Sequence, residues 1–205
     1  KVLPRVVTRL ASFGFSARHF AKNLDFLNPV TYNKFYKWVK NDLSFTDSVL
    51  LTGTVDKKTR KVQECSLSNY PGDKFAKENL TSVVWYNFFV NKFKNMVFDY
   101  YDKFNIKVRG YDLDMDLQIL RYEETDFYIP HVDYHKRFPR HFSFSYIINN
   151  DYEGGELIFT LANNENVSIK ATANSCVMFP SNFMFPHSVK EVTKGVRYVL
   201  VGWMK

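Results

Sequence analysis

From Tyr111 to the end of the chain, apolar and polar residues alternate in short runs that are separated by turn residues. Alternation with a period of two predicts β-strands with one buried face, and the enrichment in β-branched and aromatic residues supports that prediction. Many short strands at such close spacing are typical of a sandwich, a barrel or a jelly roll. The predicted strands lie within the runs DLQILRYEE, RHFSFSYIINN, GELIFTL, NVSIKA, SCVMFP, HSVKEV and GVRYVLVGW.

The first half of the chain follows a helical period instead. Residues 28–42 begin with Asn28, a residue that caps helices well, and Pro29, which suits the first helical turn. Aromatic and aliphatic residues then recur three and four positions apart, which predicts a helix with one apolar face. These residues are Tyr32, Phe35, Tyr36 and Val39.

A second and longer helix is predicted over residues 80–104. Its N-cap is expected at Thr81 or Ser82, and its apolar stripe is wide enough to need a large partner surface. The stripe is expected to contain Val84, Phe88, Phe89, Phe93, Met96, Val97 and Tyr100.

The two halves are expected to form one domain that comprises residues 1–205. A chain of this length can enclose a sizeable core, and no linker is visible. Residues 1–110 are interpreted as mainly helical support, and residues 111–205 as a β-rich core whose outer face the helices cover. Residues 52–74 are polar and turn-rich, and we interpret them as a long loop or irregular hairpin that closes over a site as a lid.

Charge and composition restrict the partners and the cellular setting. The net charge of +7 would concentrate nucleic acid or acidic peptides around the protein, but the lysines are scattered, and a solvated basic surface is the simpler explanation. No apolar run approaches the roughly 20 residues of a bilayer-spanning helix, so we expect no membrane partner. The start KVLPRVV lacks the order of a secretory signal, and Cys65 and Cys176 stand in no C-x-x-C arrangement. These features favour a cytoplasmic setting over a disulfide scaffold or a thiolate zinc site.

The stretch IPHVDYH contains three metal-capable side chains, two of which share one side of a predicted strand. His131 and Asp133 stand two residues apart, so an extended backbone presents an imidazole and a carboxylate together. A third ligand has to come from elsewhere. The candidates are His135, His141, His19 and His187.

The last predicted strand carries an arginine among apolar neighbours. In GVRYVLVGW the alternation places Arg197 on the same face as Val199 and Val201. A buried guanidinium without an anion is very costly. The anion is either an internal aspartate or glutamate, or the carboxylate of a ligand that the arginine holds by two parallel hydrogen bonds.

Three segments, taken in order, resemble the prolyl 4-hydroxylase branch of the iron(II)- and 2-oxoglutarate-dependent dioxygenases. They are LQILRYEETDFYIPHVDYH, INNDYEGGELIF and FPHSVKEVTKGVRYVLVGW, and they match the family's R-Y strand, H-x-D motif, E-G-G turn, distant histidine and G-x-R run before a tryptophan. The close resemblance covers residues 117–203, while the helical half matches only loosely. It implies an α+β fold in which a double-stranded β-helix, a cupin-like jelly roll, carries N-terminal helices packed on one sheet.

The resemblance also implies an iron site and an activity. His131, Asp133 and His187 would be the Fe(II) ligands, two imidazoles and one carboxylate on one face of the metal. The open coordination positions would accept 2-oxoglutarate and O2, whose reaction oxidises a C–H bond of the substrate to an alcohol. Ascorbate is the expected reductant, and the chain is expected to be a 2-oxoglutarate-dependent dioxygenase.

Four further residues are assigned to the cosubstrate pocket by the resemblance. Arg197 would pair with the far carboxylate of 2-oxoglutarate, and Tyr122 would reach the cosubstrate with its hydroxyl group. Ser143 stands where relatives often have a threonine that lines this pocket, and Trp203 would form a wall of it. Ile147 departs from the family pattern, because many relatives have a tyrosine there.

The expected reaction is 4-hydroxylation of peptidyl-proline, coupled to the conversion of 2-oxoglutarate to succinate and CO2. Basic residues would line the rim of the site, and three of them, Arg137, Arg140 and Lys61, would contact an extended, proline-containing peptide or protein. The expected rim residues are Lys57, Lys58, Arg60, Lys61, Arg137 and Arg140. Hydroxylation of peptidyl-lysine or of a free amino acid is the alternative within the same chemistry. The target protein, the hydroxylated carbon and the oligomeric state stay open.

Two functions outside amino-acid hydroxylation also stay open. Nucleic-acid demethylation would suit the positive charge, but relatives of that kind carry a second arginine soon after the first, and no arginine follows Arg197. Nucleic acid is therefore a disfavoured partner. A non-catalytic jelly roll that binds a sugar or a metal, or that holds zinc with the same three ligands, would release no succinate.

Overall fold

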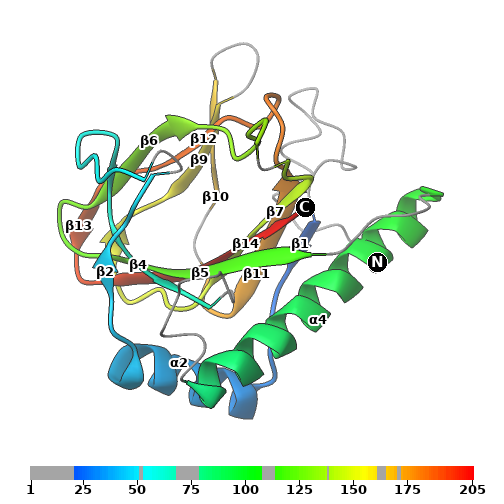
Figure 1. Ribbon diagram of the computed structural model, residues 1–205, viewed down its shortest axis with the longest axis horizontal. Helices are drawn as coiled ribbons and strands as arrows, with labels where there is room; N and C mark the ends of the chain where they lie inside the picture. The colour runs from blue at the N-terminus through cyan, green and yellow to red at the C-terminus, as the bar shows by residue number, and fades with distance from the viewer. Residues whose placement is uncertain are drawn as a thin grey trace.

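The structure is a computed structural model, and it describes residues 21–50, 53–67, 79–107, 114–137, 139–160, 165–169 and 172–205. Two antiparallel β-sheets enclose an apolar core, and two helices lie outside the larger sheet (Figure 1). This arrangement confirms the predicted α+β class and the jelly roll. Among the described residues, no helix combines the length and the apolarity needed to cross a bilayer.

The larger sheet contains seven strands in the order β1-β11-β7-β14-β5-β4-β2. Every neighbouring pair is antiparallel, and the central strands β5 and β14 pair over their full lengths. The strands are β1 (Ala21–Asn23), β2 (Thr46–Asp47), β4 (Gln63–Ser66), β5 (Met115–Tyr122), β7 (Phe142–Ile147), β11 (Ser175–Pro180) and β14 (Arg197–Met204).

The smaller sheet contains five strands in the order β10-β9-β12-β6-β3, again antiparallel. A short two-stranded sheet stands beside it. The five strands are β3 (Arg60–Lys61), β6 (Phe127–His131), β9 (Leu157–Thr160), β10 (Asn166–Ile169) and β12 (His187–Val189), and the pair is β8 (Glu153–Gly154) and β13 (Val192–Lys194).

Helix α2 (Pro29–Asp42) begins where the sequence predicts. The side chain of Asn28 accepts a hydrogen bond from the backbone N–H of Thr31 at 2.9 Å, and Pro29 fills the first turn, where an N–H has no intrahelical partner. Phe35 and Val39 are fully buried. The predicted apolar face is therefore confirmed at these two positions.

Helix α4 (Leu80–Phe104) also has the predicted bounds, but two details of the prediction are wrong. The N-cap is Asn79, whose side-chain oxygen accepts hydrogen bonds from the backbone N–H groups of both Thr81 and Ser82. Val84 is 64% exposed, so it lies outside the buried stripe. The cap lies two residues before Thr81, and asparagine is preferred to threonine at an N-cap.

Strand β14 separates an outer core from the interior of the jelly roll. Its outward side chains, such as Leu200 and Met204, are buried under the helices, while Val199 belongs to the core between the sheets. Gly202 lets the helix approach closely, because a Cβ there would lie 2.8 Å from Leu117 and 3.0 Å from Phe93. The two helices thus cover one sheet face, as predicted.

The prediction of a lid over residues 52–74 is wrong for residues 60–66. Strand β3 pairs with β6 in the smaller sheet, and β4 pairs with β5 in the larger one, so this segment is a wall of the fold. The sequence did not predict these strands because most positions on both of their faces are polar, so apolar and polar residues do not alternate there. Residue 52 and residues 68–74 lie outside the described residues.

Candidate active site

Two histidines lie side by side on neighbouring strands of the smaller sheet. His131 ends β6 and His187 begins β12, and the antiparallel register places the two residues directly opposite each other. Their ring centroids are 4.3 Å apart. Strand pairing therefore brings together two residues that are far apart in the sequence.

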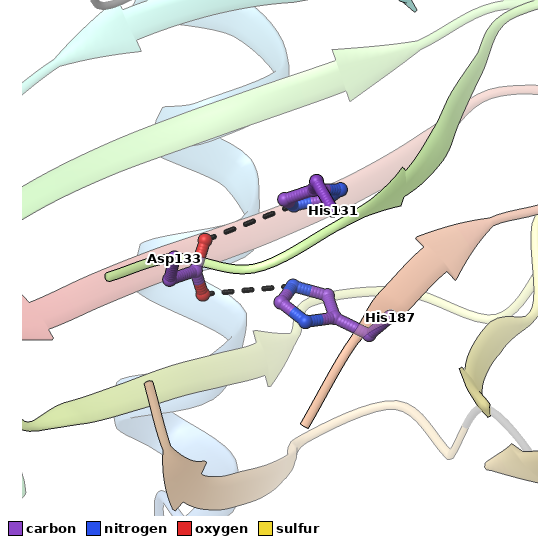
Figure 2. Close-up of side chains that lie close together, drawn as sticks. All are labelled: His131, Asp133 and His187. Carbon is purple, nitrogen blue, oxygen red and sulfur yellow. Dashed lines mark ion pairs between the residues drawn. The ribbon is translucent and has the colours of Figure 1, made fainter. Parts of the chain in front are cut away.

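Asp133 completes this cluster from a bend that follows β6. One carboxylate oxygen, Oδ1, lies 3.7 Å from Nε2 of His131, and the other, Oδ2, lies 3.5 Å from Nε2 of His187 (Figure 2). The strand ends at His131, so the prediction that both H-x-D residues lie in one strand is wrong. The backbone N–H of Tyr134 donates to the carbonyl of Ser181 at 2.8 Å, which holds the bend in place.

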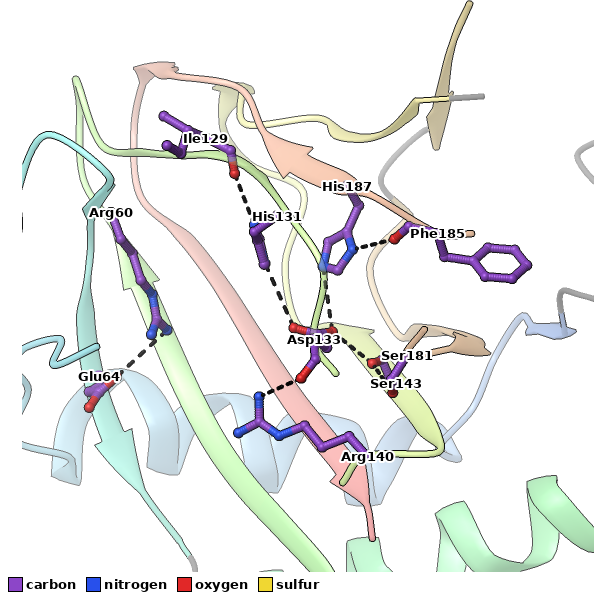
Figure 3. A network of polar contacts seen from close by, with 10 residues as sticks. All are labelled: Arg60, Glu64, Ile129, His131, Asp133, Arg140, Ser143, Ser181, Phe185 and His187. Carbon is purple, nitrogen blue, oxygen red and sulfur yellow. Dashed lines mark hydrogen bonds and ion pairs between the residues drawn. The ribbon is translucent and has the colours of Figure 1, made fainter. Parts of the chain in front are cut away.

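The cluster can hold a metal ion, because its three ligand atoms all lie within 4.8 Å of one another. Nδ1 of His131 is 2.9 Å from the carbonyl oxygen of Ile129, and Nδ1 of His187 is 3.0 Å from that of Phe185 (Figure 3). A carbonyl only accepts, so each Nδ1 carries the proton and each Nε2 keeps its lone pair. Both lone pairs are on the nitrogens nearest to Asp133, as metal coordination requires.

The charges of the cluster suit a divalent cation. Burial and the neighbouring His187 lower the pKa of His131 to about 3, so this imidazole is neutral at physiological pH. Burial acts to raise the pKa of Asp133, but the two imidazoles and a hydrogen bond from Ser143 together lower it below its usual value. Imidazoles and a carboxylate in this ratio are the donor set of mononuclear Fe(II) oxygenases.

Two buried serines hold the carboxylate of Asp133 in position. Oγ of Ser143 donates to Oδ2 of Asp133 at 2.7 Å and lies 2.7 Å from Oγ of Ser181 (Figure 3). The single proton of Ser143 is used toward Asp133, so Ser181 donates to Ser143. Ser143 thus contacts a proposed metal ligand and does not line the cavity, whereas Phe144 and Ser145 of β7 do.

A cavity of about 180 Å³ opens beside the cluster, between the two sheets. It has an apolar body with a few polar groups, as is typical of a small-molecule site. Its lining includes the three residues of the cluster together with Tyr122, Arg197 and Trp203.

Arg197 is the least exposed charged residue that lines this cavity, with only 2% of its surface exposed. It lies opposite Tyr122 in the register of β14 and β5. Its Nε and Nη1 have no hydrogen-bond partner, and no carboxylate forms an ion pair with it, within the described ranges. An internal aspartate or glutamate therefore does not supply its anion there, and unpaired buried N–H groups of this kind fit the carboxylate of a ligand.

The E-G-G turn makes room for the side chain of Arg197. This contact could not be predicted from the sequence. Gly155 has a φ of 64°, and a Cβ on it would lie 2.9 Å from Cδ of Arg197. Gly154 has a φ of 74°, and its Cβ would lie 2.3 Å from the carbonyl oxygen of Glu191. Both glycines are thus needed for the turn, and Gly155 also shapes the arginine's pocket.

The residues predicted for the substrate rim differ in their surroundings. Arg140 lines the cavity, and its guanidinium carbon lies 4.0 Å from the ring centroid of Trp203. Lys61 forms an ion pair with Asp126 at 3.3 Å and does not line the cavity, and exposed Arg137 does not line it either. Another of the predicted rim residues, Arg60 of β3, does line the cavity.

The other candidate metal ligands are not in the cluster. His135 and His141 are exposed and lie outside the group of three, while His19 lies outside the described residues. Of the four candidates for the third ligand, only His187 joins His131 and Asp133 in the described parts of the chain.

Comparison with known proteins shows which family this site resembles. Residues 117–205 match the family model of the 2OG-Fe(II) oxygenase superfamily. A PKHD-type hydroxylase of Prochlorococcus marinus (strain MIT 9312) is 41% identical over 64 residues, which are 31% of this chain and 28% of the relative. Another, from Synechococcus sp. (strain CC9902), is 37% identical over 91 residues, 42% of this chain and 40% of the relative. The matched segments thus span less than half the length of these curated relatives.

Solved structures share the fold over nearly the whole chain. A Pseudomonas putida prolyl-4-hydroxylase aligns with a TM-score of 0.66 at 20% identity, covering 98% of this chain and 97% of its own. A Trichoplax adhaerens prolyl hydroxylase in complex with a hypoxia inducible factor peptide fragment aligns with a TM-score of 0.67 at 19% identity, covering 97% and 86%. The predicted resemblance to prolyl 4-hydroxylase-like oxygenases is confirmed.

Proposed function

We propose that this chain, which resembles the prolyl 4-hydroxylase-like branch of the 2OG-Fe(II) oxygenase superfamily, is an Fe(II)- and 2-oxoglutarate-dependent dioxygenase. The observation that carries the proposal is one cavity that contains both a His-Asp-His cluster and a buried arginine without an anion in the described residues. A metal-binding module without a cosubstrate has no use for that arginine. The superfamily match over residues 117–205 supports the same chemistry.

Each residue of the cavity has a definite task in this proposal. His131, Asp133 and His187 bind the metal, and Ser143 fixes the orientation of the carboxylate. Arg197 binds the far carboxylate of 2-oxoglutarate by charge-assisted hydrogen bonds. Bound Fe(II), 2-oxoglutarate and O2 would supply the oxidation of a C–H bond, with succinate and CO2 as co-products.

The apolar walls of the same cavity keep bulk water away from the metal and the cosubstrate. Tyr122 and Trp203 form parts of these walls, and burial raises the pKa of the Tyr122 hydroxyl, which therefore stays a neutral donor. The hydroxyl can then donate to the cosubstrate, as predicted from the sequence.

The proposed substrate is a proline residue in a peptide, hydroxylated at C4. Two of the solved structures that share the fold are prolyl hydroxylases, one of them in complex with a peptide fragment. The cavity lining includes Val132, which is 38% exposed, so the cavity reaches the surface beside the metal cluster. Ascorbate is proposed as the reductant that keeps the iron ferrous.

A mass-spectrometric assay tests both levels of this proposal. The protein is incubated with Fe(II), 2-oxoglutarate, ascorbate and proline-rich peptides, and both succinate and the masses of the peptides are measured. Addition of one oxygen to proline supports the full proposal. Oxygen on lysine or on a free amino acid would keep the chemistry and refute the substrate. The absence of succinate under all conditions would refute the oxygenase itself.

A further inference from the structure

We propose that Arg60 is a second anion-binding residue of the active cavity and that it selects substrates that carry a carboxylate next to the hydroxylated position. This inference rests on the proposed function, because it concerns the group that approaches the metal. It adds a substrate class, since peptidyl-proline alone has no charge near the target carbon.

Arg60 is buried to an extent that is unusual for a residue of an edge strand. Only 9% of its surface is exposed, and it lines the same cavity as the His-Asp-His cluster. Its Nε has no hydrogen-bond partner within the part of the chain that the structure describes. A buried guanidinium with an unused N–H is stabilised when an acceptor from a ligand reaches it.

The guanidinium is held in a fixed place close to the metal cluster. Its carbon lies 5.0 Å from the ring centroid of Tyr128, and the Tyr128 ring in turn stacks on the His131 ring at 3.5 Å with an interplanar angle of 16°. Arg60, Tyr128 and His131 therefore form a continuous stack. An anion bound to Arg60 would be one aromatic ring away from a proposed metal ligand.

The internal partner of Arg60 satisfies it only in part. Nη2 of Arg60 lies 3.6 Å from Oε2 of Glu64, which is long for a hydrogen bond (Figure 3). The same oxygen accepts a short hydrogen bond from Oγ of Ser48, and the other, Oε1, accepts one from the backbone N–H of Val49 at 3.4 Å. Glu64 therefore shares its charge among three partners.

The charge balance of the loaded cavity favours an anionic substrate. The charged residues that line it are Arg60, Arg140, Arg197 and Asp133. A bound Fe(II) dication and a 2-oxoglutarate dianion cancel each other, so Arg197 and Asp133 leave no net charge between them. The remaining charged residues of the lining are Arg60 and Arg140, and Glu64, which does not line the cavity, offsets Arg60 only in part because it also accepts hydrogen bonds from Ser48 and Val49. A substrate carboxylate neutralises this excess.

Two sources can supply that carboxylate: an acidic side chain beside the target proline, or the free carboxyl end of a peptide that finishes with proline. We test both with matched synthetic peptides. In the first pair, one peptide has glutamate next to the proline and the other has glutamine at the same position. In the second pair, both peptides end in proline, one with a free carboxyl group and the other with an amide. The peptides are titrated calorimetrically into protein with and without Mn(II) and N-oxalylglycine, and the same peptides are scored for hydroxylation with Fe(II).

The acid member of at least one pair is expected to bind about tenfold more tightly than its amide, because it adds a charge-assisted pair. R60Q should remove this preference, and Arg60→Lys should retain only part of it, since lysine lacks the planar fork. Lys58→Gln is the matched control, because it removes one charge from an exposed residue that does not line the cavity.

Several outcomes would overturn the role of Arg60. Equal binding of acid and amide in both pairs would refute it from the wild type alone, whether or not the variants fold, and so would the absence of peptide binding. An unchanged preference in R60Q, with a normal circular dichroism spectrum, would also refute it. Failure of the wild type to bind Mn(II) or N-oxalylglycine would instead refute the proposed function.

Discussion

Arg197 and Tyr122 face each other across β14 and β5, and the guanidinium carbon lies 4.9 Å from the centroid of the phenol ring. The ring supports one face of the guanidinium and leaves its N–H edge for the cavity. This relationship explains how a strand-borne arginine can stay buried without an internal anion in the described residues: the protein keeps the group aligned for a ligand.

Replacement of Arg197 by alanine should weaken the binding of 2-oxoglutarate and leave the metal site largely intact. A hydrogen bond to a charged group contributes roughly 1.5–3 kcal/mol, so the dissociation constant for 2-oxoglutarate should rise by at least about tenfold. Titration with 2-oxoglutarate in the presence of Mn(II) measures the effect, and Mn(II) affinity is the control. An unchanged 2-oxoglutarate affinity would contradict the assignment of this pocket.

Removal of one side chain of the cluster should abolish metal retention. Asp133→Ala and His187→Ala each leave two of the three donors, which is too few for stable binding of Fe(II) or Mn(II). Electron paramagnetic resonance of Mn(II) titrations reports the loss directly. His141→Ala is the matched control, because this exposed histidine lies outside the cluster. Equal loss in the control would show that the metal binds elsewhere.

Ser143→Ala should lower the affinity for Mn(II) by about tenfold, since loss of a residue that orients a ligand typically costs 10–100-fold. The variant removes the hydrogen bond to Oδ2 of Asp133. Ser181→Ala should have a smaller effect, because Ser181 acts through Ser143. A comparison of the two titrations, with thermal melts as a check on folding, tests this order. The reverse order would show that the serines act on Asp133 differently.

Gly155→Ala should reduce the affinity for 2-oxoglutarate, because the new Cβ would lie 2.9 Å from Cδ of Arg197 and displace it. A several-fold weakening is expected, together with about 1 kcal/mol or more of lost stability from the positive φ. Gly53→Ala is the control: Gly53 has a φ of 80° and no atom within 4 Å of the added Cβ. It should lose stability and keep its 2-oxoglutarate affinity.

The metal-free protein should lose stability as the pH falls below 6.5. His131 has a folded pKa of about 3, below the ordinary value of 6.5, so the unfolded state binds more protons across this window. The slope contributed by this one group is at most about 1.4 kcal/mol per pH unit. Urea unfolding of the wild type and of His131→Gln between pH 6.5 and 5 isolates the effect, because aspartates titrate at lower pH. Parallel curves for the two proteins would contradict it.

Much of the strand arrangement could be predicted from the sequence because alternation and burial coincide there. β14 is the clearest case: Val199 faces the interior and Leu200 faces the helices, as the pattern indicates. The seven predicted runs each contain a strand of the described fold.

Other features could not be predicted because they depend on contacts between distant parts of the chain. β3 and β4 are polar on both faces, and only their pairing partners identify them as strands. The roles of Ser143 and Arg60 follow from the neighbours Asp133, Ser181 and Tyr128, which no local pattern reveals. The cluster was predicted through family motifs, since spacing alone left four candidates for the third ligand.

A single residue, Val62, lies between the last residue of β3 and the first of β4, and the two strands belong to different sheets. At that corner the sheets are tied by one buried link and cannot spread apart without breaking strand pairs on both sides. Arg60 lies two residues before Val62, so this junction also fixes where its backbone stands in the cavity wall.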